Sequence, residues 1–196
     1  MKKLVVATSN PGKLKEMQEY LTAKDWQLEL KPPELEVVET GLTFTENARL
    51  KASTVAKTLN QWAIADDSGL TVEALNGAPG IYSARYARTD SERINKLLKE
   101  LEGNPNRRAQ FICAVAIASP DGSIFASAIG ICHGEISTTP TGSNGFGYDP
   151  IFYVPQYQQT FAQMSPELKQ RVSHRGLAFA DLLSQLETSN DNSTDI

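Results

Sequence analysis

The sequence is poor in cysteine and histidine, with two of each in 196 residues. Neither Cys113 nor Cys132 lies in a CxxC or CxH pattern, so we expect two reduced core thiols rather than a zinc site. No Ser/His/Asp or Cys/His arrangement of a covalent nucleophile stands out either. If the chain catalyses a hydrolysis, direct attack by water is therefore the simpler chemistry.

Long hydrophobic runs and a positive net charge are also missing. The first apolar run, residues 4–7, is too short for a signal peptide, and no stretch could span a bilayer. We therefore expect a cytoplasmic protein without a membrane partner. The net charge of −4 and the pI near 5.3 argue against broad nucleic-acid binding, which needs a basic face. A local basic pocket for a small polyanion is not excluded.

What is present is the hydrophobic periodicity of an α/β fold with a mixed sheet. The chain is long enough for a sizeable core, and Pro120-Asp121-Gly122 signals a hairpin that brings in antiparallel pairing. We expect residues 1–188 to form a single two-lobed domain and residues 189–196 a disordered tail. The expected strands are 4–7, 26–30, 62–65, 111–118, 123–132 and 151–154; the expected helices are 14–21, 43–59, 94–101 and 177–186.

The first segment with chemical potential is residues 8–13, between a buried strand and a helix start. Free backbone N–H groups and the positive end of the helix dipole favour an anion at such a place. Lys13 adds a full charge and Asn10 an amide donor. The spacing is not that of a Walker A loop, and on this segment alone a plain turn with a helix cap is the favoured interpretation.

A second segment surrounds the start of the next helix. Thr43 and Glu46 have the spacing of a capping box, while Asn47 and Lys51 lie at i and i+4 on one helix face. That face could reach phosphate, but spacing alone favours a solvated surface. Glu39, in the loop just upstream, is uninformative by itself.

Asp66 and Asp67 close the apolar strand predicted at residues 62–65. Strand ends in α/β folds are common ligand sites, and adjacent carboxylates repel unless a cation or donors accompany them. Carboxylate oxygens suit Mg²⁺, which usually takes one or two of them together with substrate phosphates. A magnesium site is therefore somewhat favoured over an Asp-rich turn.

Two later segments add recognition groups. Residues 145–150 combine glycines, which let the backbone approach a flat ligand, with aromatics and Asp149, which can accept from ring N–H groups. Residues 173–176 place His174 beside Arg175 at a helix start, with Lys169 upstream, and so concentrate donors for an anion or carbonyl. A tight loop and a structural histidine are the alternative interpretations.

Six blocks in this order resemble the inosine/xanthosine triphosphate pyrophosphatase family, the RdgB-like dITP/XTP pyrophosphatases. The resemblance runs from Lys3 to about Leu186. It is carried by TSNPGK (8–13), ETGLTFTENARLKA (39–52), IADDSGL (64–70), GAPGIYSARYA (77–87), TGSNGFGYDPIF (141–152) and SHRGLA (173–178).

This resemblance implies an elongated α/β unit with two lobes around a mixed sheet and a central substrate cleft, usually in a homodimer. It implies hydrolysis of ITP, dITP and XTP to the monophosphate and pyrophosphate, with Mg²⁺ as cofactor and a nucleoside triphosphate as the small-molecule partner. Asp67 would be the catalytic proton acceptor, and Glu39, Asp67 and Asp66 the metal site. The substrate would contact Thr8, Ser9, Asn10, Lys13, Lys51 and Ser68, and its base would contact Phe146, Gly147, Tyr148, Asp149, Lys169, His174 and Arg175.

The selectivity has a chemical interpretation. Hypoxanthine and xanthine carry a keto oxygen where adenine carries an amino group, so donors such as Arg175 and Lys169 would favour the keto bases. The runner-up function is a Maf-like nucleotide pyrophosphatase acting on modified or pyrimidine triphosphates. An alternative from another class is a nucleotide-binding module without turnover.

Overall fold

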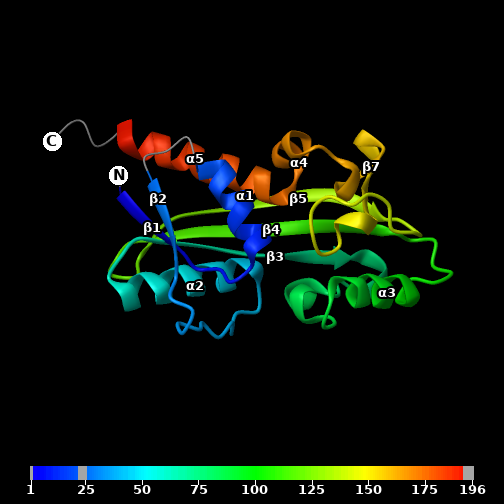
Figure 1. Ribbon diagram of the computed structural model, residues 1–196, viewed down its shortest axis with the longest axis horizontal. Helices are drawn as coiled ribbons and strands as arrows, with labels where there is room; N and C mark the ends of the chain where they lie inside the picture. Colours follow the sequence, from blue (N-terminus) through cyan, green and yellow to red (C-terminus); the bar gives the residue numbers. More distant parts are fainter. Residues whose placement is uncertain (1, 22–25, 192–196) are drawn as a thin grey trace. The chain divides into compact units, whose positions relative to one another are not determined.

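The computed structural model describes residues 2–21 and 26–191, and its strands form a seven-stranded sheet in the order β2-β1-β3-β4-β5-β6-β7 (Figure 1). β1 is parallel to β2 and β3, whereas β6 is antiparallel to β5 and β7, which confirms the mixed sheet and the α/β class. The strands are β1 (Lys2–Val6), β2 (Trp26–Leu30), β3 (Ala63–Val72), β4 (Arg108–Ala118), β5 (Ile124–Ile136), β6 (Phe152–Val154) and β7 (Gln159–Thr160). The α-helices are α1 (Pro11–Leu21), α2 (Phe44–Leu59), α3 (Asp90–Glu100), α4 (Pro166–Val172) and α5 (His174–Asp191).

The chain divides into two compact units. Unit 1 consists of Met1–Asp67, Cys113–Gly130 and Arg175–Ile196, and unit 2 of Ser68–Ile112 and Ile131–His174. β3, β4 and β5 each contribute residues to both units. Each unit has its own hydrophobic core cluster.

Unit 1 has helices on both faces of its strands (Figure 1). Met17 of α1 and Phe179 of α5 pack with Ile64 and Ile117 in one core cluster. On the opposite face, α2 buries its small apolar stripe, as the helical spacing predicts. α2 begins where Thr43 accepts the Glu46 N–H at 3.1 Å. The Glu46 carboxylate accepts from the Leu42 N–H instead of from Thr43, so the predicted capping box is only half formed.

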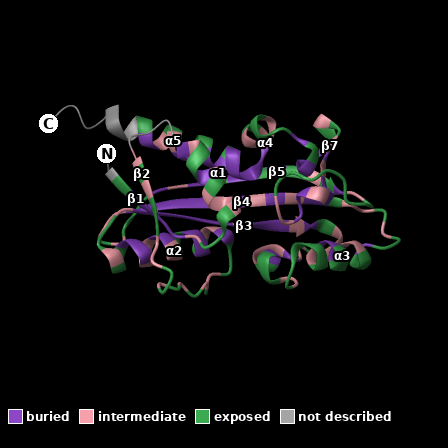
Figure 2. Ribbon diagram, in the orientation of Figure 1, coloured by how far each residue is buried: buried purple, intermediate pink, exposed green. Residues whose placement is uncertain are grey.

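Unit 2 is built around an aromatic cluster. The rings of Phe111, Phe152 and Phe161 lie 4.7–5.7 Å apart, centroid to centroid, in the core that α3 also joins. In its part of β4, residues 108–112, successive residues alternate between buried positions and positions that are exposed or half-buried. Figure 2 shows the contrast between the buried length of β3 and the largely exposed surface of α3.

The predicted elements are present, with differences at their ends. β3 runs on to Val72, well past the predicted end at Ala65. α4 and β7 were not predicted, because each is very short. α5 includes residues 189–191 of the expected disordered tail, and residues 192–196 lie outside the described part of the chain.

Two expectations about individual features can also be compared with the structure. The hairpin turn is present, with the Gly122 N–H donating to the Ser119 carbonyl at 2.8 Å. Both cysteines are free and buried, as expected. None of the helices in the described residues is long and apolar enough to cross a membrane.

The unit 2 core provides a stability test. Leu97 of α3 is fully buried, so Leu97→Ala should lower the free energy of unfolding by about 2–5 kcal/mol, because it removes buried methyl groups and leaves a cavity. The control is Leu42, which is 84% exposed. Leu42→Ala should change the free energy of unfolding by less than about 0.5 kcal/mol. Urea denaturation of both variants measures the difference, and equal losses would contradict the assignment of Leu97 to the core.

Candidate functional site

Two adjacent carboxylates in the middle of β3 form the centre of a charge cluster in unit 1. Asp66 and Asp67 are both buried, at 1% and 6% relative exposure. Side chains of consecutive strand residues point to opposite faces, so the two carboxylates meet different helices. Asp66 accepts from Lys13 of α1 at 3.0 Å and from the Arg175 guanidinium of α5 at 3.0 and 3.3 Å. Asp67 instead meets residues of α2.

The start of α1 positions Lys13. The Asn10 side-chain oxygen accepts from the N–H groups of Gly12 and Lys13, at 2.9 and 3.2 Å, so Asn10 caps the helix. Thr8 in turn accepts from the Asn10 N–H at 3.1 Å, and Ser9 is exposed. The predicted anion loop is therefore an ordered cap that carries a lysine already paired with a carboxylate.

The cations around Asp66 decide its charge. Burial alone would raise the pKa of Asp66, but Lys13 and Arg175 outweigh burial and hold the pKa well below its usual range. Arg175 is 2% exposed and also donates to Glu16 of α1. Its guanidinium is thus a bridge between two carboxylates of unit 1, whereas the sequence suggested a base-reading donor. A base contact by Arg175 stays a prediction.

Asp67 and Glu39 converge on Lys51. The Lys51 ammonium lies 2.7 Å from Glu39 Oε1 and 3.4 Å from Asp67 Oδ1. The other oxygen of Asp67, Oδ2, accepts from the Asn47 amide at 3.1 Å. Burial raises the pKa of Asp67, and Lys51 and Lys13 oppose this increase only in part. The pKa of Lys51 is raised, since the neighbouring carboxylates outweigh its burial.

In unit 2 the predicted base loop is organised by Asp149. Its buried Oδ2 accepts from the Phe146 N–H at 2.9 Å and from Lys169 at 2.7 Å. The Lys169 ammonium also lies 5.1 Å from the Phe146 ring centroid, within cation–π range. Gly145 has φ +76°, and a Cβ there would collide with the Asp149 carboxylate. The structure therefore brings Phe146, Asp149 and Lys169 together, and their contact with a base stays a prediction.

The remaining predicted residues of unit 2 have other surroundings. Gly147 donates its N–H to Asp90 of α3 at 2.8 Å. Tyr148 is a core residue, 4% exposed, whose hydroxyl donates to the Ser83 carbonyl at 3.0 Å. His174 is 5% exposed and stacks on Phe111 at 4.6 Å between centroids. Ser68, on β3, is half-buried.

Three contributing residues were not predicted as parts of a site. Glu16 and Asp90 look like ordinary charges of helix surfaces, and only the folded chain shows that they bond Arg175 and Gly147. The i,i+4 spacing of Asn47 and Lys51 placed both residues on one helix face, but it did not indicate the hydrogen-bond partner of Asn47. Its amide bonds Asp67 at 3.1 Å rather than facing solvent.

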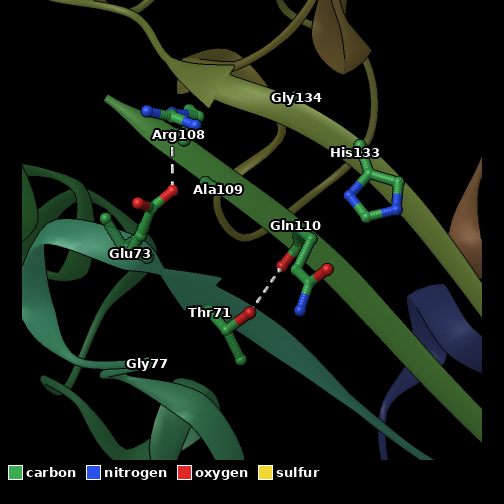
Figure 3. Close-up of a pocket in the computed structure, with 9 residues that line it drawn as sticks. Thr71, Glu73, Gly77, Arg108, Ala109, Gln110, His133 and Gly134 are labelled. Atoms are coloured by element: carbon green, nitrogen blue, oxygen red, sulfur yellow. Dashed lines mark hydrogen bonds and ion pairs between the residues drawn. The ribbon is translucent and has the colours of Figure 1, made fainter. Parts of the chain in front are cut away.

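A shallow hollow elsewhere in unit 2 contains none of the predicted residues. It is lined by Thr71, Glu73, Arg108, Gln110 and His133 (Figure 3). Its polar groups are partly paired with each other, through Arg108–Glu73 at 3.4 Å and the Thr71 hydroxyl to the Gln110 carbonyl at 3.4 Å. The charge cluster and the base loop are thus better candidates for a polyphosphate site than this hollow.

The position of Arg175 leads to a stability prediction. Arg175→Ala should lower the free energy of unfolding by about 3–5 kcal/mol, because it leaves the buried Asp66 carboxylate without its guanidinium partner. The control is Arg108→Ala, which breaks an exposed ion pair and should cost less than about 1 kcal/mol. Denaturant unfolding at neutral pH compares them. A loss for Arg175→Ala as small as the control's would show that the buried bridge is not structural.

Known proteins resemble this chain over nearly its whole length. It is 68% identical to the dITP/XTP pyrophosphatase of Nostoc sp., covering 93% of each chain, and 64% identical to that of Synechocystis sp., covering 94% of this chain and 95% of the relative. The solved structure of a HAM1 protein from Coxiella burnetii is 43% identical with a TM-score of 0.87, and covers 96% of this chain and 100% of that one. The profile of the Ham1 family matches residues 4–185. The chain belongs to the Ham1 family.

Proposed function

We propose that this protein hydrolyses non-standard purine nucleoside triphosphates, namely ITP, dITP and XTP, to the monophosphate and pyrophosphate. The observation that carries the proposal is the convergence of Glu39 and Asp67 on the Lys51 ammonium, with Lys13 on the neighbouring carboxylate. Half-buried cations paired with carboxylates suit a substrate that arrives as a metal-bound polyphosphate. The relatives named dITP/XTP pyrophosphatase support the substrate class.

The residues present fit a magnesium ion. In the described part of the chain, no three His, Cys, Asp or Glu side chains are grouped to hold a metal by themselves. Mg²⁺ does not require such a cage, because it commonly binds one or two carboxylates plus substrate phosphates. Glu39 and Asp67 already face one cation, the Lys51 ammonium, and would hold the ion. Bound Mg²⁺ would neutralise phosphate charge and polarise a phosphoryl oxygen.

Asp66 fits the metal site less well. Its Oδ2 is occupied by Lys13 and Arg175, and only Oδ1 has no hydrogen-bond partner among the described residues. We therefore assign Asp66 to holding Lys13 and Arg175 in place, and keep a metal contact through Oδ1 as a secondary role. This assignment leaves Glu39 and Asp67 as the principal pair.

Asp67 is the proposed proton acceptor. Burial raises its pKa, so its carboxylate is a better base than an exposed aspartate. A water oxygen would bond to the α-phosphorus while its proton passes to Asp67. The bond from the α-phosphorus to the bridging oxygen would break, and pyrophosphate would leave. Lys13 and Lys51 would neutralise the charge that develops on the phosphate oxygens.

The loop of unit 2 is the proposed reader of the purine base. Phe146 supplies an aromatic face, and Lys169, held by Asp149, supplies a donor for a keto oxygen. Adenine presents an amino group at that position, and a donor facing a donor is left unpaired, which costs affinity. Tyr148 and His174 are buried in unit 2 and would support the base-reading loop from the core.

Other functions are less well supported. A Maf-like pyrophosphatase would share the hydrolytic chemistry, but the match to the Ham1 family and the presence of the base loop favour purine substrates. A binding module without turnover would not need Asp67 with a raised pKa beside Lys51. The proposed location is the cytoplasm.

The decisive experiment measures pyrophosphate release from ITP, XTP, dITP, GTP and ATP. We expect Mg²⁺-dependent release from the first three that EDTA abolishes, with kcat/KM for ITP at least about 100-fold above that for ATP. Asp67→Asn should lower kcat/KM by about 100- to 10,000-fold, because it removes the proton acceptor but keeps the shape. Equal rates for ITP and ATP would refute the substrate class, and an unimpaired Asp67→Asn variant would refute the proposed base.

We also propose a homodimer as the working form. Ile129 and Ile131 point to one face of β5 and remain 51% and 40% exposed, which is unusual for neighbouring large apolar side chains. A second copy of this chain would cover them symmetrically.

The dimer has its own test. Ile131→Glu should shift the mass measured by light scattering from two chains to one, because burial of a charge opposes association. Leu42→Glu, on an exposed loop residue, is the control and should leave the mass unchanged. A single-chain mass for the unmodified protein would rule out the dimer.

A further inference from the structure

The side chain of Asn47 joins the two proposed metal-binding carboxylates. Its Nδ2 donates to Asp67 Oδ2 at 3.1 Å, and its Oδ1 accepts from the Gly41 N–H at 2.8 Å. Gly41 lies two residues after Glu39 in the same loop. One amide group therefore connects the loop that carries Glu39 with the strand that carries Asp67.

The burial of Asn47 shows that this connection is specific. The residue is 1% exposed, in the first turns of α2, where asparagine is a poorer helix former than alanine. A buried amide costs free energy unless both of its ends are hydrogen-bonded. Both ends are bonded here, one to the side chain of Asp67 and one to the backbone of the loop that leads into α2.

Asn47 and Lys51 act together because they are one helical turn apart on α2. Asn47 holds Oδ2 of Asp67, while Lys51 contacts Oδ1 of Asp67 and the side chain of Glu39. The orientation of the Asp67 carboxylate is thereby set at both oxygens. The Glu39 loop is tied at its side chain by Lys51 and at its backbone by Asn47.

The space around Gly41 shows how closely the loop approaches the helix. A Cβ on Gly41 would lie 2.7 Å from Asn47 Oδ1 and 2.7 Å from Glu46 Cβ, closer than such atoms normally come. Any side chain at this position would push the loop away from α2. Gly41 is therefore the second half of the same connection.

We propose that Asn47 is a positioning residue that, through Gly41, keeps Glu39 and Asp67 at the spacing needed to share one divalent cation. The proposal rests on the function proposed above and deepens it. Asn47 itself touches neither substrate nor metal. Its removal should therefore affect cation binding and turnover more than substrate affinity or folding.

The test compares four variants with the unmodified protein. Asn47→Ala removes both bonds, Asn47→Asp keeps an acceptor for Gly41 but loses the donor to Asp67, and Gly41→Ala displaces the loop. Ser53→Ala is the control on the same helix, since it removes a bond to the Gly122 carbonyl and none to Glu39, Gly41 or Asp67 that the structure describes. Thermal unfolding verifies that each variant is folded.

The first measurement needs no turnover. Mn²⁺, a hard cation with the same ligand preference, is titrated by electron paramagnetic resonance in the presence of pyrophosphate, which supplies the phosphate oxygens that such a site needs but is not turned over. Asn47→Ala and Gly41→Ala should weaken Mn²⁺ binding by about 10- to 100-fold. Hydrogen exchange of the Gly41 amide should accelerate in Asn47→Ala but stay slow in Asn47→Asp. Ser53→Ala should match the unmodified protein in Mn²⁺ affinity and in the exchange rate of the Gly41 amide.

The second measurement is steady-state kinetics with ITP. At saturating Mg²⁺, Asn47→Ala and Asn47→Asp should lose about 10- to 100-fold in kcat while KM stays within about threefold. In the double variant Asn47→Ala/Gly41→Ala, the loss in kcat should be smaller than the combined losses of the two single variants, because both substitutions break the same connection. Folded Asn47→Ala protein with unchanged Mn²⁺ affinity and unchanged kcat would overturn the proposal. If no purine triphosphate is hydrolysed by the unmodified protein, the proposed function fails, while Mn²⁺ binding and Gly41 exchange still decide the role of Asn47.

Discussion

Two neighbouring carboxylates buried in the middle of one strand are the constraint on which the site depends. Asp66 and Asp67 expose 0% and 9% of their side chains, and buried charges are tolerated only when they are paired. Strand geometry turns them to opposite faces, so each requires its own partners. Lys13 and Arg175 serve Asp66, and Lys51 with Asn47 serves Asp67. Because these partners come from α1, α5 and α2, the docking of three helices and the charge state of the strand depend on each other.

The different partners give Asp66 and Asp67 different roles, whereas both carboxylates were predicted from the sequence to belong to the metal site. The pKa of Asp66 is held low by fixed cations, so Asp66 is an anion that orders Lys13 and Arg175. The pKa of Asp67 is raised by burial, because its partners compensate less completely. Under the proposed function, this difference in pKa would make Asp67, and not Asp66, the carboxylate that accepts a proton.

The sequence predicted most of the secondary-structure elements and the family, but not the long-range partners of the charged side chains. Periodicity located every α-helix except α4, and the motif blocks indicated the correct family. The strand at residues 62–65 was predicted too short because Asp66 and Asp67 resemble a polar turn. In the structure both carboxylates are paired with cations from other elements, and β3 continues to Val72. The carboxylate partners of Arg175 could not be predicted, because nothing local to it reveals Glu16 or Asp66, and its contact with the base stays a prediction. Spacing placed Asn47 on the face of Lys51 without indicating that Asp67 lies opposite.

The base loop is held by a set of contacts that lies wholly within unit 2. Asp149 fixes Phe146 and Lys169, Asp90 holds the Gly147 backbone, and Tyr148 anchors the loop in the core. The charge cluster is complete in unit 1 without any of these groups. Under the proposed function, substitutions in the loop would therefore change which base is accepted, while the carboxylates and lysines keep their geometry. Under the proposed function, this independence explains how one hydrolytic arrangement can serve different nucleobases: the cluster acts on the phosphates common to every nucleotide, and selectivity is left to Lys169 and the aromatic face beside it.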